Sequence, residues 1–143
     1  MNVPIDDGKC FACGPENPIG LHLRFEPAAN GVRARLTLAP EFQGWQNIAH
    51  GGIVMALLDE AMAHAAGYAG HRGVTASVNV RFRKPVPLGE PLELAGEVRW
   101  QRRSVLGLDA TLRDADGTTL AHADGHFVSV GPIEAANDRR NPG

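Results

Sequence analysis

The pattern of hydrophobic and polar residues differs from segment to segment of the chain, and the longest apolar stretch predicts a helix. Residues 50–68 are rich in strong helix formers, carry apolar side chains on all sides and end near Gly67 and Gly70. A helix that is apolar all round is normally enclosed, so we expect a sheet to wrap around it. Asn47 is the candidate cap near its start.

Alternation with a period of two predicts strands on both sides of this helix. The Asn30-Gly31 pair and the segment Asp114–Gly117 indicate hairpin turns. Pro85 and Pro87 indicate that the first strand after the helix is bent or lies at an edge. The predicted strands are residues 20–26, 32–38, 74–86, 92–102, 106–114 and 118–130. This order predicts an α+β fold in which an antiparallel sheet of about five or six strands surrounds one long central helix.

The 143 residues are the size of one domain with a core of its own. We expect a Pro- and Gly-rich lead-in over residues 1–19, the folded domain over residues 20–130 and a loosely ordered polar tail over residues 131–143.

Charge and composition exclude several partners. A net charge of -2 without a dominant basic stripe argues against a nucleic-acid partner. The chain starts with neither a basic segment nor the apolar run of a signal peptide. The helical segment is shorter than a membrane span and carries Asp59, Glu60 and His64, so we expect no membrane insertion and a cytoplasmic protein.

Cys10 and Cys13 form a single Cys-x-x-Cys pair in the lead-in. The pair is followed by Gly14 and Pro15 rather than by a helix, which argues against a thioredoxin-like redox site. One pair does not complete a four-ligand zinc site within one chain, although two chains could supply four thiolates. A reduced turn near the subunit surface is the favoured interpretation, and we expect no metal and no cofactor.

The start of the helix suggests chemistry at a carbonyl group. Gly51 and Gly52 leave backbone N–H groups open at the positive end of the helix dipole, and Asp59 follows two turns later. Gly52 and Asp59 lie on nearly the same side of the helix but about 10 Å apart along it, too far to contact one carbonyl. A two-fold dimer with antiparallel helices would supply the second group from the partner. The alternative is that Asp59 is a buried polar residue held in a hydrogen bond.

His50-Gly51-Gly52, with Asp59 nine residues after His50, and this order of strands resemble the hotdog-fold thioesterase superfamily. The chain looks most like the branch of phenylacetate-pathway and 4-hydroxybenzoyl-CoA thioesterases. Residues 10–21 and the segment Gln43-Gly44-Trp45 add to the resemblance, which covers about residues 10–130.

This resemblance implies an acyl-CoA thioesterase that works without a cofactor as a homodimer or homotetramer. It implies that the Gly52 N–H holds the thioester oxygen and that Asp59 of the neighbouring subunit is the nucleophile or general base. His50 would orient the substrate or the loop. Some relatives carry Asn where this chain has Gly44, and Asn47 is the candidate replacement in substrate binding.

Other candidate substrate-binding residues have a structural alternative beside the functional one. Thr75 matches a Ser or Thr that assists in some relatives, or is an ordinary strand residue. Met55 and Met62, near the Asp59 side of the helix, would line an acyl pocket or pack in the core.

Two basic clusters are candidates for binding the phosphates of coenzyme A. Arg83 and Lys84, after Arg81, form one, and Arg102 with Arg103 forms the other. A solvated charged face is the alternative for both. For the whole protein, the alternative function is a non-catalytic acyl-CoA or acyl-carrier binding protein of the same fold; a dehydratase or hydratase fits the motif less well.

Overall fold

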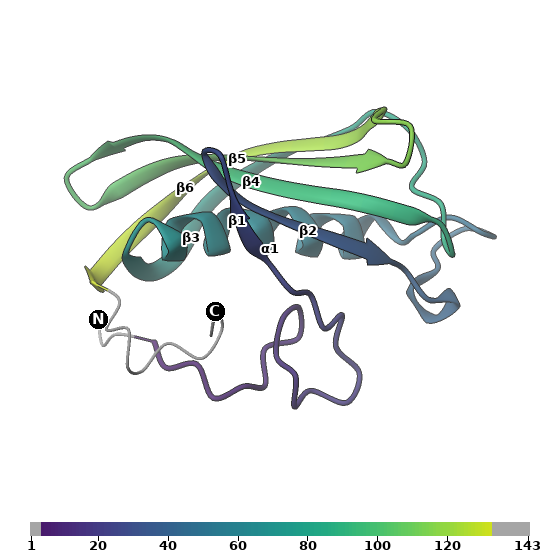
Figure 1. The fold of residues 1–143 in the computed structure, drawn as a ribbon, viewed down its shortest axis with the longest axis horizontal. Helices are drawn as coiled ribbons and strands as arrows, with labels where there is room; N and C mark the ends of the chain where they lie inside the picture. The colour runs from purple at the N-terminus through teal and green to yellow at the C-terminus, as the bar shows by residue number, and fades with distance from the viewer. Residues whose placement is uncertain (1–3, 133–143) are drawn as a thin grey trace.

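The computed structural model describes residues 4–132, in which one curved sheet surrounds one long helix (Figure 1). The six strands have the order β1-β2-β4-β5-β6-β3, and all neighbours are antiparallel. This confirms the α+β hotdog fold. The elements are β1 (Glu26–Ala28), β2 (Gly31–Thr37), the short 3-10 helix η1 (Pro40–Phe42), α1 (Gly51–Tyr68), β3 (His71–Phe82), β4 (Pro91–Arg102), β5 (Val105–Asp114) and β6 (Thr119–Pro132).

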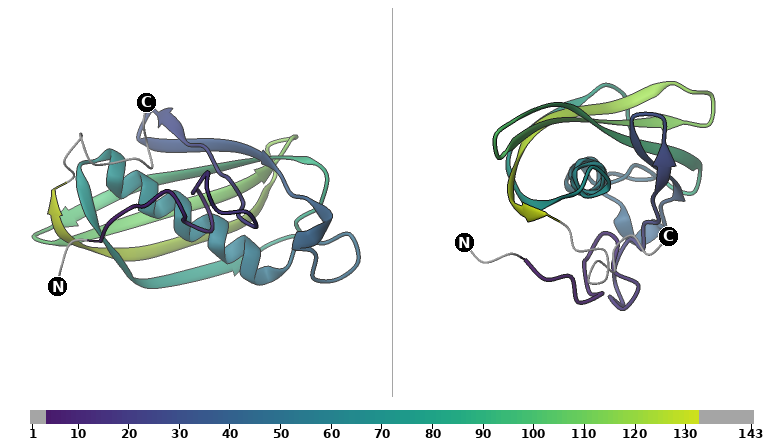
Figure 2. Two further views of the ribbon diagram at one scale, coloured as in Figure 1. Left: turned by 90° about the horizontal axis from the view of Figure 1, so that it is seen from below. Right: turned by 60° about the vertical axis from the view of Figure 1, so that its left-hand side comes forward.

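Helix α1 lies in the hollow of the sheet, as the end-on view in Figure 2 shows. Leu57, Leu58 and Ala61 are fully buried. The apolar helix side chains that the sequence predicts to be enclosed therefore form part of the core. Gly96 of β4 permits the close approach of helix and sheet, because a Cβ at this position would collide with the backbone carbonyl of Ala61. The sheet therefore packs along the length of α1 and leaves one flank of the helix accessible.

The lead-in closes the open side of this hollow (Figure 2). Ala12 and Cys13 are buried and belong to the same core cluster as α1. The backbone N–H groups of Leu21 and Leu23 donate to the carbonyls of Phe11 and Ala12 at 2.8 and 2.9 Å. The segment that follows the lead-in therefore pairs with it rather than with the sheet.

The predicted strand over residues 20–26 is consequently wrong for all but Glu26. His22 has a left-handed backbone (φ 51°), which breaks the extended path. Leu23 is buried while His22 and Arg24 are exposed, so the alternation is present but belongs to an irregular segment. Periodicity alone does not distinguish the two.

The ends of two later strands also differ from prediction. Strand β3 starts at His71 and ends at Phe82, because the N–H groups of Arg83 and Lys84 both bond to the Leu120 carbonyl and turn the chain out of the ladder. Strand β6 continues to Pro132, so the first two residues of the predicted tail belong to the sheet. Residues 133–143 lie outside the described residues. Between residues 4 and 132, no helix is long and apolar enough to cross a membrane.

Candidate functional site

The N-terminus of α1 is capped by a histidine. His50 Nδ1 accepts the Gly52 N–H at 2.9 Å, so the expectations that Asn47 caps the helix and that the Gly52 N–H is open are wrong for this structure. Asn47 lies in the preceding loop with a left-handed backbone (φ 62°), and its N–H donates to Gln43 Oε1. The Gly51 N–H has no hydrogen-bond partner among residues 4–132.

The cap also determines which proton His50 carries. Because Nδ1 accepts a hydrogen bond, the ring proton is on Nε2. The ring is exposed, so the tip of α1 presents two donors to solvent, the Gly51 N–H and the His50 Nε2–H. This tip can hold a developing negative charge on an oxygen atom.

Asp59 lies two turns further along α1 and is half-buried. Its Oδ1 accepts a hydrogen bond of 2.8 Å from the Thr75 hydroxyl, which joins α1 to β3. Burial raises the pKa of Asp59, Glu60 raises it further, and the Thr75 bond opposes both. A carboxylate with a raised pKa is a stronger proton acceptor, which suits a general base.

The tip and the carboxylate lie about 10 Å apart along one flank of α1. Met55 lies between them with 47% of its surface exposed. Met62 is different: only 2% is exposed, and it packs toward Gly125 of β6. The structure therefore brings Met55 to the surface of the candidate site and places Met62 in the core.

Strand β3 borders this flank and is an edge strand of the sheet. Every side chain from Val74 to Asn79 is exposed. Val74, Val78 and Phe82 are apolar and 38%, 37% and 54% exposed. A long apolar edge strand is a surface on which another strand can pair.

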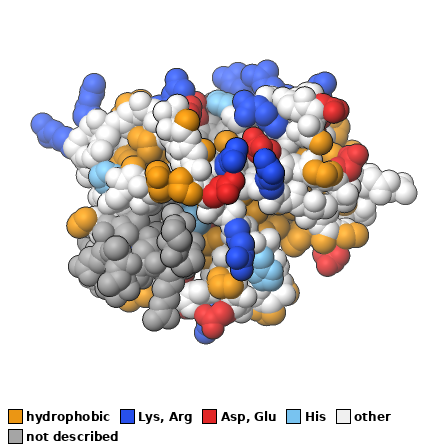
Figure 3. Space-filling view, viewed as in Figure 1, with side chains coloured by type: hydrophobic (Ala, Val, Ile, Leu, Met, Phe, Trp, Pro, Cys, Tyr) orange, Lys and Arg blue, Asp and Glu red, His pale blue; other side chains and the backbone are white. Residues whose placement is uncertain are grey.

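The two basic clusters lie at opposite ends of the molecule. Arg83 and Lys84 line a pocket of about 240 Å³ together with Gly51, beside the helix tip. Arg102 and Arg103 are exposed in the β4–β5 turn, near where β3 begins. Figure 3, in the orientation of Figure 1, shows basic side chains projecting at the end where this hairpin lies.

The loop before α1 brings Gly44 against His50. A Cβ at position 44 would lie 3.0 Å from the His50 Cα, and an isolated bridge joins Gln43 to Ala49. Glycine is therefore the residue that fits this close approach. Asn47 is exposed in the same loop, and its carbonyl accepts the Leu88 N–H.

Sequence reasoning missed a second polar cluster on another side of α1. Cys10 and Cys13 of the lead-in meet Glu60, whose Oε1 lies 3.0 Å from His64 Nε2. His64 is buried. The four-residue spacing of Glu60 and His64 was a signal that both lie on one face of the helix, but not that the lead-in covers it.

The fold and this helix define a hotdog-fold protein, and comparison with known proteins gives its family. The sequence model of the thioesterase superfamily matches residues 46–121, and the chain belongs to this superfamily. A relative is the acyl-coenzyme A thioesterase THEM4 of Bos taurus, 30% identical over 68% of this chain and 40% of its own. The chain spans about two-fifths of the length of the curated relatives it matches.

Solved structures agree in fold. A crystal structure of a thioesterase superfamily protein has a TM-score of 0.81 and 28% identity, covering 90% of this chain and 68% of that chain. A hypothetical thioesterase protein from Streptococcus pneumoniae, solved with coenzyme A, has a TM-score of 0.73 and 21% identity over 78% of this chain and 91% of that chain. Structures under the same name exist for two alanine variants, one at a threonine and one at an aspartate.

Proposed function

We propose that this chain is an acyl-CoA thioesterase, which hydrolyses a fatty or aryl acyl-CoA thioester to the free acid and coenzyme A at a site shared by two subunits. The observation that carries the proposal is the flank of α1, where a donor-bearing tip and the half-buried Asp59 adjoin β3, an edge strand of the sheet within residues 4–132. The name of the bovine relative and the coenzyme A bound by the streptococcal protein support the substrate class.

The geometry of the proposed shared site can be described on α1 and on the strand that borders it. In an antiparallel pair of helices, a two-fold axis near Met55 and Ala56 places Gly52 opposite the partner's Asp59. On β3, Thr75 contacts Asp59 while Phe82 lies closest to Gly51, so the same axis passes midway between these strand residues, near residues 78 and 79. A dimer about this axis would be centred on exposed apolar side chains, among them Met55 and Val78.

In this dimer the tip of α1 would hold the thioester oxygen, and the partner's Asp59 would act on the carbonyl carbon. As a base, it takes a proton from water while the hydroxyl adds; as a nucleophile, it forms an anhydride that water then opens. In both routes the carbon–sulfur bond breaks and coenzyme A leaves as the thiolate. In the base route the thiolate receives, from Asp59, the proton that came from water; in the nucleophile route it takes up the proton released when water opens the anhydride. Thr75 would keep the carboxylate oriented.

The streptococcal alanine variants support this pair of residues. The threonine and the aspartate replaced there are sixteen residues apart, and Thr75 follows Asp59 by the same sixteen residues. We infer that Asp59 and Thr75 contribute to one site in this chain.

The dimer would also unite the two basic clusters. Because they lie at opposite ends of a protomer, an antiparallel arrangement brings Arg102 and Arg103 of one subunit toward Arg83 and Lys84 of the other. Phosphates of coenzyme A carry the charge that such a composite cluster would recognise. The choice between dimer and tetramer, and the cytoplasmic location, stay predictions.

An activity panel tests the proposed function. We expect release of free coenzyme A thiol from at least one of the short-chain, long-chain and aromatic acyl-CoA esters, at a rate proportional to enzyme concentration. Calorimetry with the same esters measures binding separately. Tight binding without turnover across the panel would overturn the hydrolase and favour a non-catalytic acyl-CoA or acyl-carrier binding protein.

Charge reversal at the basic clusters should weaken recognition of the nucleotide part only. For Arg102→Glu with Arg103→Glu, we expect KM for acyl-CoA to rise roughly tenfold, as loss of charge-assisted phosphate contacts would give. KM for the matching acyl-pantetheine, which lacks the nucleotide, should stay the same. Arg35→Glu on the distant β2 is the matched control. An equal rise for both substrates would contradict the phosphate role.

A further inference from the structure

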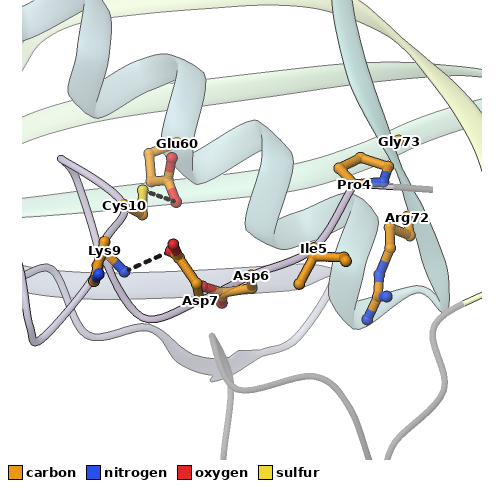
Figure 4. A pocket seen from close by; sticks show the side chains of 9 residues that line it. All are labelled: Pro4, Ile5, Asp6, Asp7, Lys9, Cys10, Glu60, Arg72 and Gly73. Carbon is orange, nitrogen blue, oxygen red and sulfur yellow. Dashed lines mark hydrogen bonds between the residues drawn. The ribbon is translucent and has the colours of Figure 1, made fainter. Parts of the chain in front are cut away.

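Two cysteines, a glutamate and a histidine converge where the lead-in crosses α1. One ligand atom each from Cys10, Cys13 and Glu60 lies within 4.8 Å of the others. Cys10 Sγ and Glu60 Oε1 are 3.8 Å apart and face each other at one end of a pocket of about 400 Å³ (Figure 4). The lead-in and the helix thus bring two thiols and a carboxylate together within a single chain, and His64 adjoins the carboxylate.

In this cluster, the buried ring nitrogen Nε2 of His64 lacks a hydrogen bond to any residue from 4 to 132. His64 is 5% exposed, and its Nε2 lies 3.0 Å from Glu60 Oε1. This contact is not aligned as a hydrogen bond, and Nε2 has no hydrogen-bond partner within the described chain. The imidazole stacks on Phe25 with ring centroids 4.3 Å apart, which fixes it in place. A buried ring nitrogen without a hydrogen bond, beside a carboxylate that itself meets two sulfurs, is suited to become a ligand.

The position of Cys13 beside Glu60 also suits a ligand to a cation. Cys13 is buried, and its Sγ, the Cys10 Sγ and a Glu60 carboxylate oxygen form one group. A metal ion bound there would displace the thiol protons and offset the negative charge of the carboxylate. The Cys13 N–H already donates to Cys10 Sγ at 3.4 Å, a contact that stabilises a thiolate.

We propose that Cys10, Cys13, Glu60 and His64 bind one zinc ion within each chain. Zinc is the metal that suits sulfur, nitrogen and oxygen ligands in a tetrahedron. Around such an ion, a sulfur and an oxygen ligand lie about 3.6 Å apart, close to the separation of Cys10 and Glu60. The ion joins the lead-in to the side of α1 that does not carry Asp59. Its role is structural, because all four positions are filled by protein.

Metal content tests the site directly. We expect the full chain, purified or refolded with zinc under reducing conditions, to hold about one zinc per chain, with release of the thiol protons on binding. Cobalt in place of zinc should give the absorption of a tetrahedral thiolate site. Cys10→Ser and Glu60→Gln should each lower zinc affinity roughly tenfold or more, and a chelator should lower the melting temperature of the wild type but not of Cys10→Ser.

Two exposed residues near the lead-in supply matched controls: Glu16→Gln and His22→Gln should keep full zinc content. The proposal is overturned if reconstituted wild type holds less than about a tenth of a zinc per chain. It is equally overturned if Cys10→Ser binds zinc as the wild type does, or if thiol titration finds a Cys10–Cys13 disulfide that persists with zinc and reductant. None of these readouts depends on hydrolysis, so failure here leaves the proposed function untouched.

Discussion

Asp59→Asn is expected to lower kcat for acyl-CoA hydrolysis by about 1,000-fold while changing KM little, because it removes the group that activates water or attacks the carbonyl. The asparagine Oδ1 can still accept the hydrogen bond from Thr75, so the side chain should keep its place. Steady-state kinetics on the best ester of the panel measures the effect.

A matched variant separates this chemistry from a general loss of charge. Asp109 is also half-buried, but it lies on β5 beside Arg99 and His122, away from the helix tip. Asp109→Asn should retain nearly full activity. A fully active Asp59→Asn enzyme would remove Asp59 from the mechanism.

The dependence of kcat on pH tests the role of Asp59 in a second way. Burial raises the pKa of Asp59, and only the deprotonated carboxylate can act as a base or nucleophile. Wild-type kcat should therefore fall as pH drops through this raised pKa, and residual Asp59→Asn activity should lack that limb. The effect on the free energy of unfolding has the opposite dependence on pH. A carboxyl whose pKa is raised in the folded state favours folding at low pH, and this contribution is lost as the pH rises. Asp59→Asn should thus be at least as stable as wild type at neutral pH.

Features that depend on neighbouring residues in sequence were predictable here. The helix over residues 50–68 was predicted within one residue of α1, because apolar helix formers and the glycines at its end act locally. The Asn30-Gly31 signal correctly marked a hairpin, although the loop is Ala29 and Asn30 while Gly31 begins β2. Consecutive residues are separated by about 100° around a helix, which is why Asp59 contacts Thr75 while Glu60 contacts His64 on another side of α1.

Features that depend on which segment packs against which were not predictable from periodicity. The alternation around Leu23 does not reveal that its backbone pairs with the lead-in. His50 is an uncommon N-cap residue, so Asn47 was preferred, and only the path of the loop shows which side chain reaches the Gly52 N–H. Cys10 and Glu60 are fifty residues apart, and their meeting requires the complete fold.

The strongest test of a shared site combines one chain that has a damaged helix tip with another chain that lacks the acid. Gly52→Val places a branched side chain against the His50 ring, since a Cβ there already lies 3.1 Å from Nδ1. This should disturb the helix tip and abolish activity, as Asp59→Asn does at the other half. Each pure variant dimer then contains two damaged sites.

Co-refolding equal amounts of the two variants should restore about a quarter of wild-type activity, because half of the dimers are mixed and each mixed dimer has one intact site. The intact site combines the tip from the Asp59→Asn chain with the carboxylate from the Gly52→Val chain. Differently tagged chains allow the mixed dimer to be isolated, where half of the wild-type activity per dimer is expected. If the tip and the carboxylate of one chain served the same site, the mixed dimer would be as inactive as its parents. Restored activity therefore requires that the acid act across the two-fold axis.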